Sequence, residues 1–338
     1  VNFIPAAIAN LSRLQTFLLR GNNADCLLPK TIWNIKTLRH LWTTDSSVGF
    51  IFPVENLEVS PGLLHLDALS LAIDPSSQSL QKILTKLPNI RRLRCKMTES
   101  REEATRIGNG FLWFDCLSQL ESLTLLYFDI YGIKFPLNLK KLTFVYNKQP
   151  WSEIPTIGKL PKLEVLKLVG CSFLEWEMKE GEFPSLRVLI LREWLDFRRW
   201  TASSDNFPRL EKLVVHWCTE LEEVPSCLGE CPTLEMIEVK RCSESLANSV
   251  KQIQQEQRDM GNEALKILIE GCVDARSSSE EEEESECGSS ETEPISSEEE
   301  SESSEEEEES ESSSSETESI SFPPKKKQKK ESISSQGV

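Results

Sequence analysis

Ten cysteines and three histidines are the residues of this chain best suited to bind a metal or to act in catalysis. The histidines are scattered and match no nucleophile or metal motif. Cys218, Cys227 and Cys231 are nine and four residues apart, which fits no zinc signature. The sequence also lacks a phosphate loop of the form G-x-x-x-x-G-K-[ST]. We therefore predict that the chain is not an enzyme and carries no catalytic, cofactor-binding or metal-binding residue of its own.

The elements that would position functional side chains follow an internal repeat. Eleven segments begin with an apolar residue followed by another at +3 and, except for Thr43 in the second segment, by a third at +5, as in Leu163-Leu166-Leu168; successive segments begin 19 to 30 residues apart. This matches the leucine-rich repeat, whose units of ~20–29 residues each add one strand to a parallel sheet. The first residues are Leu14, Leu38, Leu66, Ile90, Leu120, Leu139, Leu163, Leu186, Leu210, Leu234 and Ala264.

The repeat predicts the fold class. We expect an α/β chain whose residues 1–272 form a leucine-rich-repeat solenoid of about eleven repeats, with a curved parallel sheet and an irregular convex side. No apolar run approaches the ~18 residues that a membrane span requires. We therefore expect no membrane span.

Position +8 of the repeat supports this assignment. It holds a small polar residue in six units: Asn22, Asn147, Cys171, Cys218, Cys242 and Cys272. In this fold the position faces inward, where it can satisfy backbone groups of the turn. The cysteines are therefore expected to form a buried column of thiols, rather than a zinc site or a disulfide framework. Unpaired thiols favour a reducing compartment and hence a cytoplasmic location.

The side chains at −1, +1, +3 and +4 around the middle residue of each triplet should face solvent on the concave side of the sheet. Of these 44 residues, eleven are basic and four acidic, a net charge of 11 − 4 = +7. Residues 1–272 carry 32 basic and 33 acidic residues, so the rest of the domain carries −8. The candidate partner-binding residues are Arg20, His40, Trp42, Arg92, Arg94, Lys96, Tyr127, Lys141, Tyr146, Lys167, Arg192, Lys212, His216, Trp217, Lys240, Arg241 and Lys266.

This face is predicted to bind an acidic protein partner, with its Trp, Tyr and Arg side chains supplying most of the affinity. The alternative is that the charges only keep the strands soluble. The basic residues are scattered over many strands, and the domain as a whole is not basic, so the pattern does not favour nucleic acid.

Residues 273–338 differ sharply in composition. The whole chain has a net charge of −17, and this segment alone holds 22 acidic and 6 basic residues, a net charge of −16. Such a Ser/Glu-rich segment has too little apolar surface to fold, so we predict a disordered tail. Candidate phosphorylation sites, each with Glu three residues on, are Ser277, Ser278, Ser279, Ser290, Ser296, Ser297, Ser303, Ser304, Ser313 and Ser315. The alternative is a tail that only aids solubility.

A basic cluster at 325–330 follows the Ser/Glu run and resembles a monopartite nuclear localisation signal. It extends the predicted location from the cytoplasm to the nucleus. The residues concerned are Lys325, Lys326, Lys327, Lys329 and Lys330.

Two stretches go beyond a generic repeat. The run from Leu28 to Leu41, LPKTIWNIKTLRHL, resembles a segment of plant intracellular disease-resistance receptors, which join a coiled coil, a nucleotide-binding switch and leucine-rich repeats. The stretch from Ser243 to Gly261 resembles the end of the repeats in the nightshade late-blight resistance group. It should form a short helix capped by Ser245, with Leu246, Val250 and Ile253 on one face.

The resemblance implies a function in plant defence. The repeats would sense a pathogen effector or a host protein and would restrain the nucleotide switch until then. The chain begins at Val1 rather than Met, so we expect either the C-terminal part of a longer receptor or a truncated relative. ADP or ATP would bind only to a nucleotide-binding domain upstream.

Two further hypotheses involve the tail, which is not part of the family pattern. The alternative function is that of a nuclear acidic leucine-rich phosphoprotein that binds histones or other basic proteins through the tail. A regulatory hypothesis is that the tail, with its net charge of −16, folds back onto the +7 face and occludes it.

Overall fold

The computed structural model describes residues 2–20, 24–55, 57–73, 79–98, 114–128, 133–147 and 154–272. All of them belong to one compact unit, Val1–Glu283. The acidic tail with its candidate serines and lysines, and also Asn22, lie outside the described residues.

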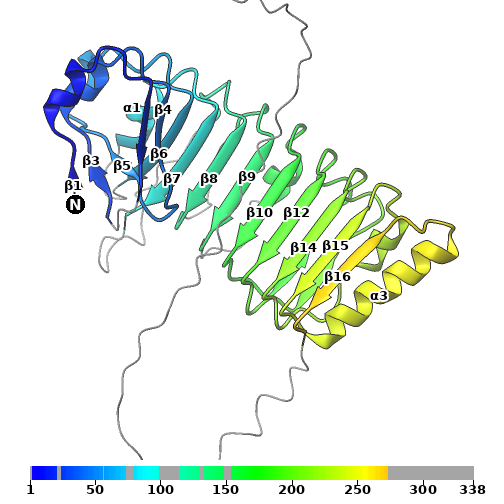
Figure 1. Ribbon diagram of the computed structural model, residues 1–338. Coiled ribbons are helices and arrows are strands. Elements are labelled where there is room, and N and C mark those ends of the chain that lie inside the picture. The colour runs from blue at the N-terminus through cyan, green and yellow to red at the C-terminus, as the bar shows by residue number, and fades with distance from the viewer. Residues whose placement is uncertain are drawn as a thin grey trace, which may run out of the picture. The chain divides into compact units, whose positions relative to one another are not determined.

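A parallel sheet dominates this unit, and a strand of the sheet lies at each of the eleven predicted repeats (Figure 1). Neighbouring strands pair with their middle anchors side by side, as Leu142, Leu166 and Leu189 do. The leucine-rich-repeat solenoid is thereby confirmed. The eleven strands are β2 (Thr16–Leu19), β4 (His40–Thr43), β6 (Ala68–Ile73), β7 (Arg92–Met97), β8 (Ser122–Leu126), β9 (Lys141–Val145), β10 (Val165–Val169), β12 (Val188–Arg192), β14 (Lys212–His216), β15 (Met236–Lys240) and β16 (Lys266–Glu270).

Alternation along each strand explains the core. In β10, Leu166 and Leu168 point inward and are fully buried, whereas Val165 and Lys167 are only partly buried on the other side. Successive side chains of a strand point to opposite sides of the sheet, so each strand places two side chains in one continuous core, and both are apolar except in β4, where Leu41 is followed by Thr43. The inward side is covered by the segments that connect the strands.

Short strands that the repeat pattern does not predict lie at the N-terminal end (Figure 1). β1 (Asn2–Phe3), β3 (Cys26–Leu27) and β5 (Phe50–Ile51) pair in parallel with one another, and β5 reaches β6 where Phe50 lies opposite Leu71. Gly49 allows this close approach, because a Cβ atom at that position would lie 2.6 Å from the amide nitrogen of Ala72.

The connecting segments contain short helices and a second small sheet. The sheet consists of β11 (Glu175–Glu177) and β13 (Arg199–Thr201), and the rings of Trp176 and Trp200 stack in it at 5.4 Å. The helices are α1 (Ser79–Leu84), α2 (Ile154–Gly158) and α3 (Glu244–Asp259), with 3-10 turns at Ala6–Asn10, Lys30–Asn34, Leu57–Val59 and Ser226–Glu230.

The predicted column of buried thiols is present behind the strand ends. Cys171, Cys218 and Cys242 are at most 5% exposed, and Cys272 is half-buried. Each thiol donates to the carbonyl oxygen two residues earlier, at 3.8, 3.5, 3.3 and 3.8 Å respectively. Burial raises the pKa of Cys171 to about 12 and that of Cys242 to about 11. Each accepting carbonyl belongs to the last residue of a strand and already accepts a backbone amide, so the thiols add a second hydrogen bond there rather than satisfying an unpaired turn group, as had been expected.

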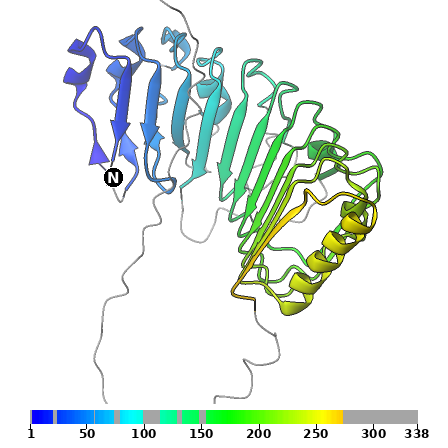
Figure 2. The ribbon, with the colours of Figure 1, turned by 45° about the vertical axis from the view of Figure 1, so that its right-hand side comes forward.

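The last connection is helix α3, which runs beside the final strands (Figure 2). Leu246, Val250 and Ile253 are buried, as predicted. The expected cap is wrong by two residues: Ser243 accepts the hydrogen bond from the amide of Leu246 at 3.1 Å, and Ser245 is exposed.

The start of the last repeat also differs from the prediction. Ala264 is exposed, and Leu265 is buried in its place. The later anchors keep the expected register, since Ile267 pairs with Ile237 and Ile269 with Val239.

Candidate binding face of the sheet

The side of the sheet opposite the core carries the predicted partner-binding residues, and we call it the open face. All 17 candidates are described, and each lies within one of the eleven strands or in the residue after it. The structure therefore brings them onto one side of one sheet. Their local surroundings differ, however, and they divide the open face into three regions.

The N-terminal region is centred on Trp42. The guanidinium of Arg94 lies 4.5 Å from the centre of the Trp42 ring, and its Nη1 donates to the carbonyl oxygen of Thr43 at 3.1 Å. Arg92 lies 3.5 Å from a carboxylate oxygen of Asp67. His40 lies 3.9 Å from the same carboxylate. The guanidinium groups of Arg92 and Arg94 therefore already have contacts within the protein.

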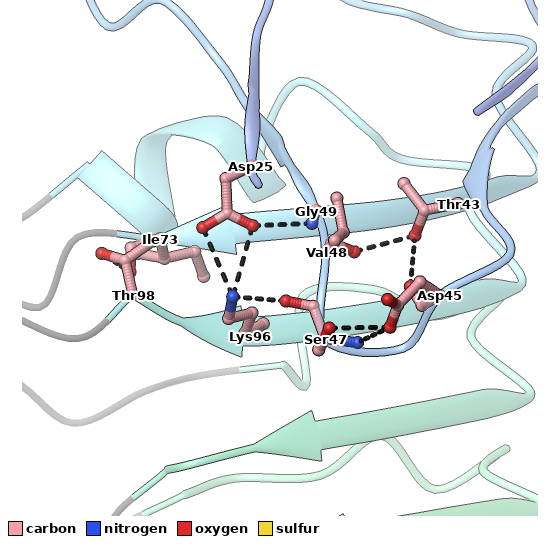
Figure 3. Close-up of polar contacts among 9 residues, drawn as sticks. All are labelled: Asp25, Thr43, Asp45, Ser47, Val48, Gly49, Ile73, Lys96 and Thr98. Carbon is pink, nitrogen blue, oxygen red and sulfur yellow. Dashed lines mark hydrogen bonds and ion pairs between the residues drawn. The ribbon is translucent and has the colours of Figure 1, made fainter. Parts of the chain in front are cut away.

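Lys96 differs most from the prediction, because its side chain contacts Asp25 and the loop between β4 and β5 (Figure 3). Its Nζ lies 3.4 Å from both carboxylate oxygens of Asp25 and also donates to the carbonyl oxygen of Ser47. Asp25 accepts a further hydrogen bond from the amide of Gly49 at 2.9 Å. The side chains of Lys96 and Asp25 are only 17% and 13% exposed. Lys96 is therefore a poor candidate for contact with a partner.

Polar groups within the loop between β4 and β5 also stabilise it (Figure 3). The hydroxyl of Thr43 donates to the carbonyl oxygens of Val48, at 2.8 Å, and Asp45, at 3.0 Å. The carboxylate of Asp45 accepts from the amide of Ser47 at 2.7 Å. Asp45, one of the four predicted acidic residues of the face, is exposed but turned into this network.

The C-terminal region is centred on Glu238, which lies between two lysines and a histidine. Its carboxylate oxygens lie 3.5 Å from Lys212, 3.2 Å from His216 and 3.1 Å from Lys240. Burial opposes ionisation of Glu238, but the hydrogen bond from Lys240 and the surrounding positive charges outweigh it and lower its pKa. Burial, with the charge of Arg192, lowers the pKa of His216. The candidate cations of this region therefore share one ionised carboxylate, and His216 is neutral at pH 7.

Aromatic side chains mark the third region, at the edge where the strands end. Tyr127 and Tyr146 stack with their ring centres 5.7 Å apart. Arg241 lies over the ring of Trp217 at 4.4 Å. All four residues have φ between 53° and 61°, in the left-handed region. They are the candidates with the most exposed rings, at 39%, 42% and 43% for Tyr127, Tyr146 and Trp217.

The remaining candidates are cations spread between these regions. Arg20, Lys141 and Lys266 are exposed, and Lys167 and Arg192 are partly buried. Within the described residues, no group of three or more His, Cys, Asp or Glu side chains could hold a metal ion. No helix in that part of the chain is long and apolar enough to cross a membrane.

Sequence reasoning missed a row of acidic residues just before the strands. Asp67 lies near Arg91 and Arg92, and Glu121 lies 3.4 Å from Lys140. The signal was available, because the position after the first residue of the repeat is acidic in five units: Asp67, Glu121, Glu164, Glu211 and Glu235. The same position is basic in four other units, Arg39, Arg91, Lys140 and Arg187, so it forms a row of mixed charge beside the positive face.

Comparisons with known proteins agree with the architecture. A family model described as a leucine-rich repeat region matches residues 1–292. The late blight resistance protein R1-A of Solanum demissum is 33% identical over 203 residues, which cover 56% of this chain and 15% of that protein. The homolog R1B-16 from the same species is 32% identical over 284 residues, which cover 80% of this chain and 21% of that protein. The chain thus spans only about a fifth or less of the length of these relatives.

A solved structure, that of PEPR1 with AtPEP1, covers 80% of this chain at 12% identity and a TM-score of 0.25. A likeness this weak indicates no function. The comparisons also give no support to the alternative of a histone-binding nuclear phosphoprotein.

Proposed function

Because the chain belongs to the leucine-rich repeat family and its repeats resemble those of late blight resistance proteins, we propose that it is the recognition region of a plant disease-resistance receptor. Its open face binds a protein, either a pathogen effector or a host protein. In the absence of that protein, the repeats restrain a nucleotide-binding domain of the same receptor.

One observation carries this proposal: the open face displays cations and aromatic rings from all parts of a sheet whose other side is closed. Arg20, Lys141 and Lys266 are exposed on strands at the start, middle and end of the sheet. Exposed Tyr127, Tyr146 and Trp217 supply the ring surface that dominates many protein interfaces. Repeat solenoids offer extended surfaces of this kind for binding.

The test is a paired screen of the full chain against displayed libraries of secreted pathogen proteins and of host leaf proteins. One variant carries Lys141→Glu and Lys167→Glu on the open face. A charge-matched control carries Lys36→Glu and Lys251→Glu, two exposed positions away from that face. We expect the open-face variant to lose the partner at least tenfold in affinity and the control to keep it. Equal binding by both variants would contradict the proposal.

The screen also separates the two kinds of partner. Enrichment from the pathogen library alone supports direct recognition of an effector. Enrichment from the leaf library alone supports recognition of a host protein.

We also propose a cytoplasmic location with access to the nucleus. Nine cysteines among the described residues are free, which supports a reducing compartment. A fluorescent fusion of the full chain tests the second half of the proposal. Replacing Lys325, Lys326 and Lys327 by Ala should lower the nuclear share of the fluorescence, and an unchanged distribution would contradict it.

A further inference from the structure

The residue that follows each of the last seven strands has the same unusual backbone conformation. In the last seven strands of the main sheet, the residue after the strand has φ between 53° and 62°. We call these seven residues the strand-end row: Tyr127, Tyr146, Gly170, Glu193, Trp217, Arg241 and Gly271.

The backbone of the row extends the sheet by one hydrogen bond per strand. The amide of Tyr127 donates to the carbonyl oxygen of Val145 at 3.0 Å, and that of Trp217 donates to Lys240 at 2.9 Å. Glycine adopts a positive φ without strain, and Gly170 and Gly271 occupy two of the seven positions. The other five are not glycine, although a positive φ is disfavoured for residues with a Cβ atom. Their side chains therefore need a separate explanation.

Those side chains form two ordered groups, one of Tyr127, Tyr146 and Glu193 and one of Trp217 and Arg241. Tyr127 lies parallel to Tyr146 at an interplanar angle of 14°, and the hydroxyl of Tyr146 donates to Glu193 at 2.9 Å. The ring of Tyr146 lies across Gly170, where a Cβ atom would be only 2.2 Å from its Cδ1. On the other side of Glu193, Trp217 lies beneath Arg241 at 4.4 Å. The rings are thus held in place before any partner arrives, which lowers the entropy cost of binding.

Stabilising the fold does not explain this surface. Elsewhere in the described chain, Trp33, Trp176, Trp194 and Trp200 are at most 2% exposed. The three aromatic residues of the row are 39–43% exposed, so about two fifths of their surface gains nothing from burial. An ordered patch of exposed aromatic rings is typical of an interface centre.

Charge beside the row indicates the chemistry of the partner. Arg192 lies in β12, next to Glu193 in the middle of the row, and is partly exposed. Arg241 is exposed at the far end. The open-face positions of the last seven strands hold seven basic residues and three acidic ones, a net charge of 7 − 3 = +4. The complementary ligand is acidic.

The length of the row indicates an extended chain. Adjacent strands lie ~4.8 Å apart, so seven strands span roughly 29 Å. A fully extended polypeptide of about nine residues covers that distance.

We propose that the strand-end row binds an extended acidic segment of a partner protein. Apolar side chains of the segment pack on Tyr127, Tyr146 and Trp217, and its carboxylates meet Arg192 and Arg241. This inference rests on the proposed function, because it specifies where on the open face the partner lies and which part of the partner is recognised.

The probe is a displayed library of random twelve-residue peptides, selected against the full chain. The test variant replaces Tyr127, Tyr146 and Trp217 by Gly, which suits their positive φ and should preserve the fold. The control is Phe3→Ala, which removes a ring that is 76% exposed outside the row. Thermal unfolding of each variant verifies that it is folded before binding is compared.

We expect enriched peptides that combine acidic with bulky apolar residues. They should bind the triple glycine variant at least tenfold more weakly and Phe3→Ala as tightly as the original chain. Failure to enrich any peptide, or equal binding to the triple glycine variant, would overturn the inference. The proposed function would survive that result if a protein partner still depended on Lys141 and Lys167.

Discussion

The two ends of the sheet are built from the same repeat but are held together differently. Around β4 to β7, polar contacts bridge distant residues, such as Lys96 with Asp25 and Arg94 with Thr43. Around β10 to β15, aromatic rings and thiols fill the space behind the strands, with Trp194 as a fully buried example. At the N-terminal end, charged side chains that contact loops are less available to a partner. Toward the C-terminal end, Lys212 and Lys240 also share the carboxylate of Glu238, and what the open face keeps exposed there are the rings of Tyr127, Tyr146 and Trp217.

The largest expected effect is the loss of a ring from the aromatic core. Trp194 contacts Phe173 at 4.3 Å and Phe197 at 4.6 Å between ring centres. Trp194→Ala should lower the free energy of unfolding by about 3–5 kcal/mol, because it leaves a large cavity. Denaturant unfolding of the full chain measures it. Trp42→Ala, on the open face, is the control and should cost less than half as much; equal losses would remove the distinction between the two ends.

The thiol column should make the C-terminal end sensitive to alkaline pH. Unfolded thiols ionise near pH 8.5, whereas Cys242 and Cys171 stay protonated up to about pH 11 and 12 in the folded chain. Their raised pKa values therefore contribute stability that is fully present below about pH 8.5 and is lost as the pH rises toward the folded values. Between pH 8 and 9.5 the loss should be about 1 kcal/mol per thiol.

Denaturant unfolding across this pH range measures the loss. A variant with Cys171→Ala and Cys242→Ala should start from a lower stability but show a shallower decline with pH. The same slope in both chains would show that the column does not control the pH dependence.

Breaking the contact between Lys96 and Asp25 should have a local effect. Asp25→Ala leaves a largely buried ammonium without its carboxylate, which should cost about 1–3 kcal/mol. Hydrogen exchange should accelerate at the amide of Gly49, while the amides of β12 and β14 keep their rates. Lys30→Ala, at an exposed ion pair, is the control. Equal acceleration in every strand would mean that the contact supports the whole sheet rather than one loop.

The smallest effect is expected in the strand-end row. Tyr127→Gly loses the stack on Tyr146, but glycine adopts the positive φ at this position without strain. The two effects oppose each other, so the free energy of unfolding should change by less than about 1 kcal/mol. Leu126→Gly, one residue earlier, removes a side chain that is 2% exposed and should be clearly more destabilising. Thermal unfolding compares the two. A large loss in Tyr127→Gly would assign the row to stability instead of binding.

The sequence alone predicts the main sheet well, because the period depends on residues close together. The triplet Leu163, Leu166 and Leu168 is enough to place β10, and the same spacing places the other ten strands. The column of Cys171, Cys218 and Cys242 follows from the same period. β1, β3 and β5 are two residues long, which is too short to produce any periodic signal.

The candidate site could be predicted only in part. Its positions follow from alternation, so the 17 candidates are found on one side of the sheet. Their availability does not follow, because it depends on pairs such as Lys96 and Asp25, which are 71 residues apart in the chain. The sequence also does not predict the left-handed backbone conformation of Tyr127 and Trp217, because a glycine would be expected at a position with positive φ.

The matched register of β10, β12, β14 and β15 has an evolutionary consequence. Each of these strands pairs only with its two neighbours, and the repeats that contain β10, β12 and β14 are 23 or 24 residues long. A whole unit can therefore be duplicated or deleted by unequal recombination without a change in the packing of distant units. Such an event between β10 and β14 would move Trp217 toward or away from Tyr146 by one strand spacing. Gene rearrangement would then alter the distance between two exposed aromatic side chains in discrete steps, while point mutation changes their chemistry.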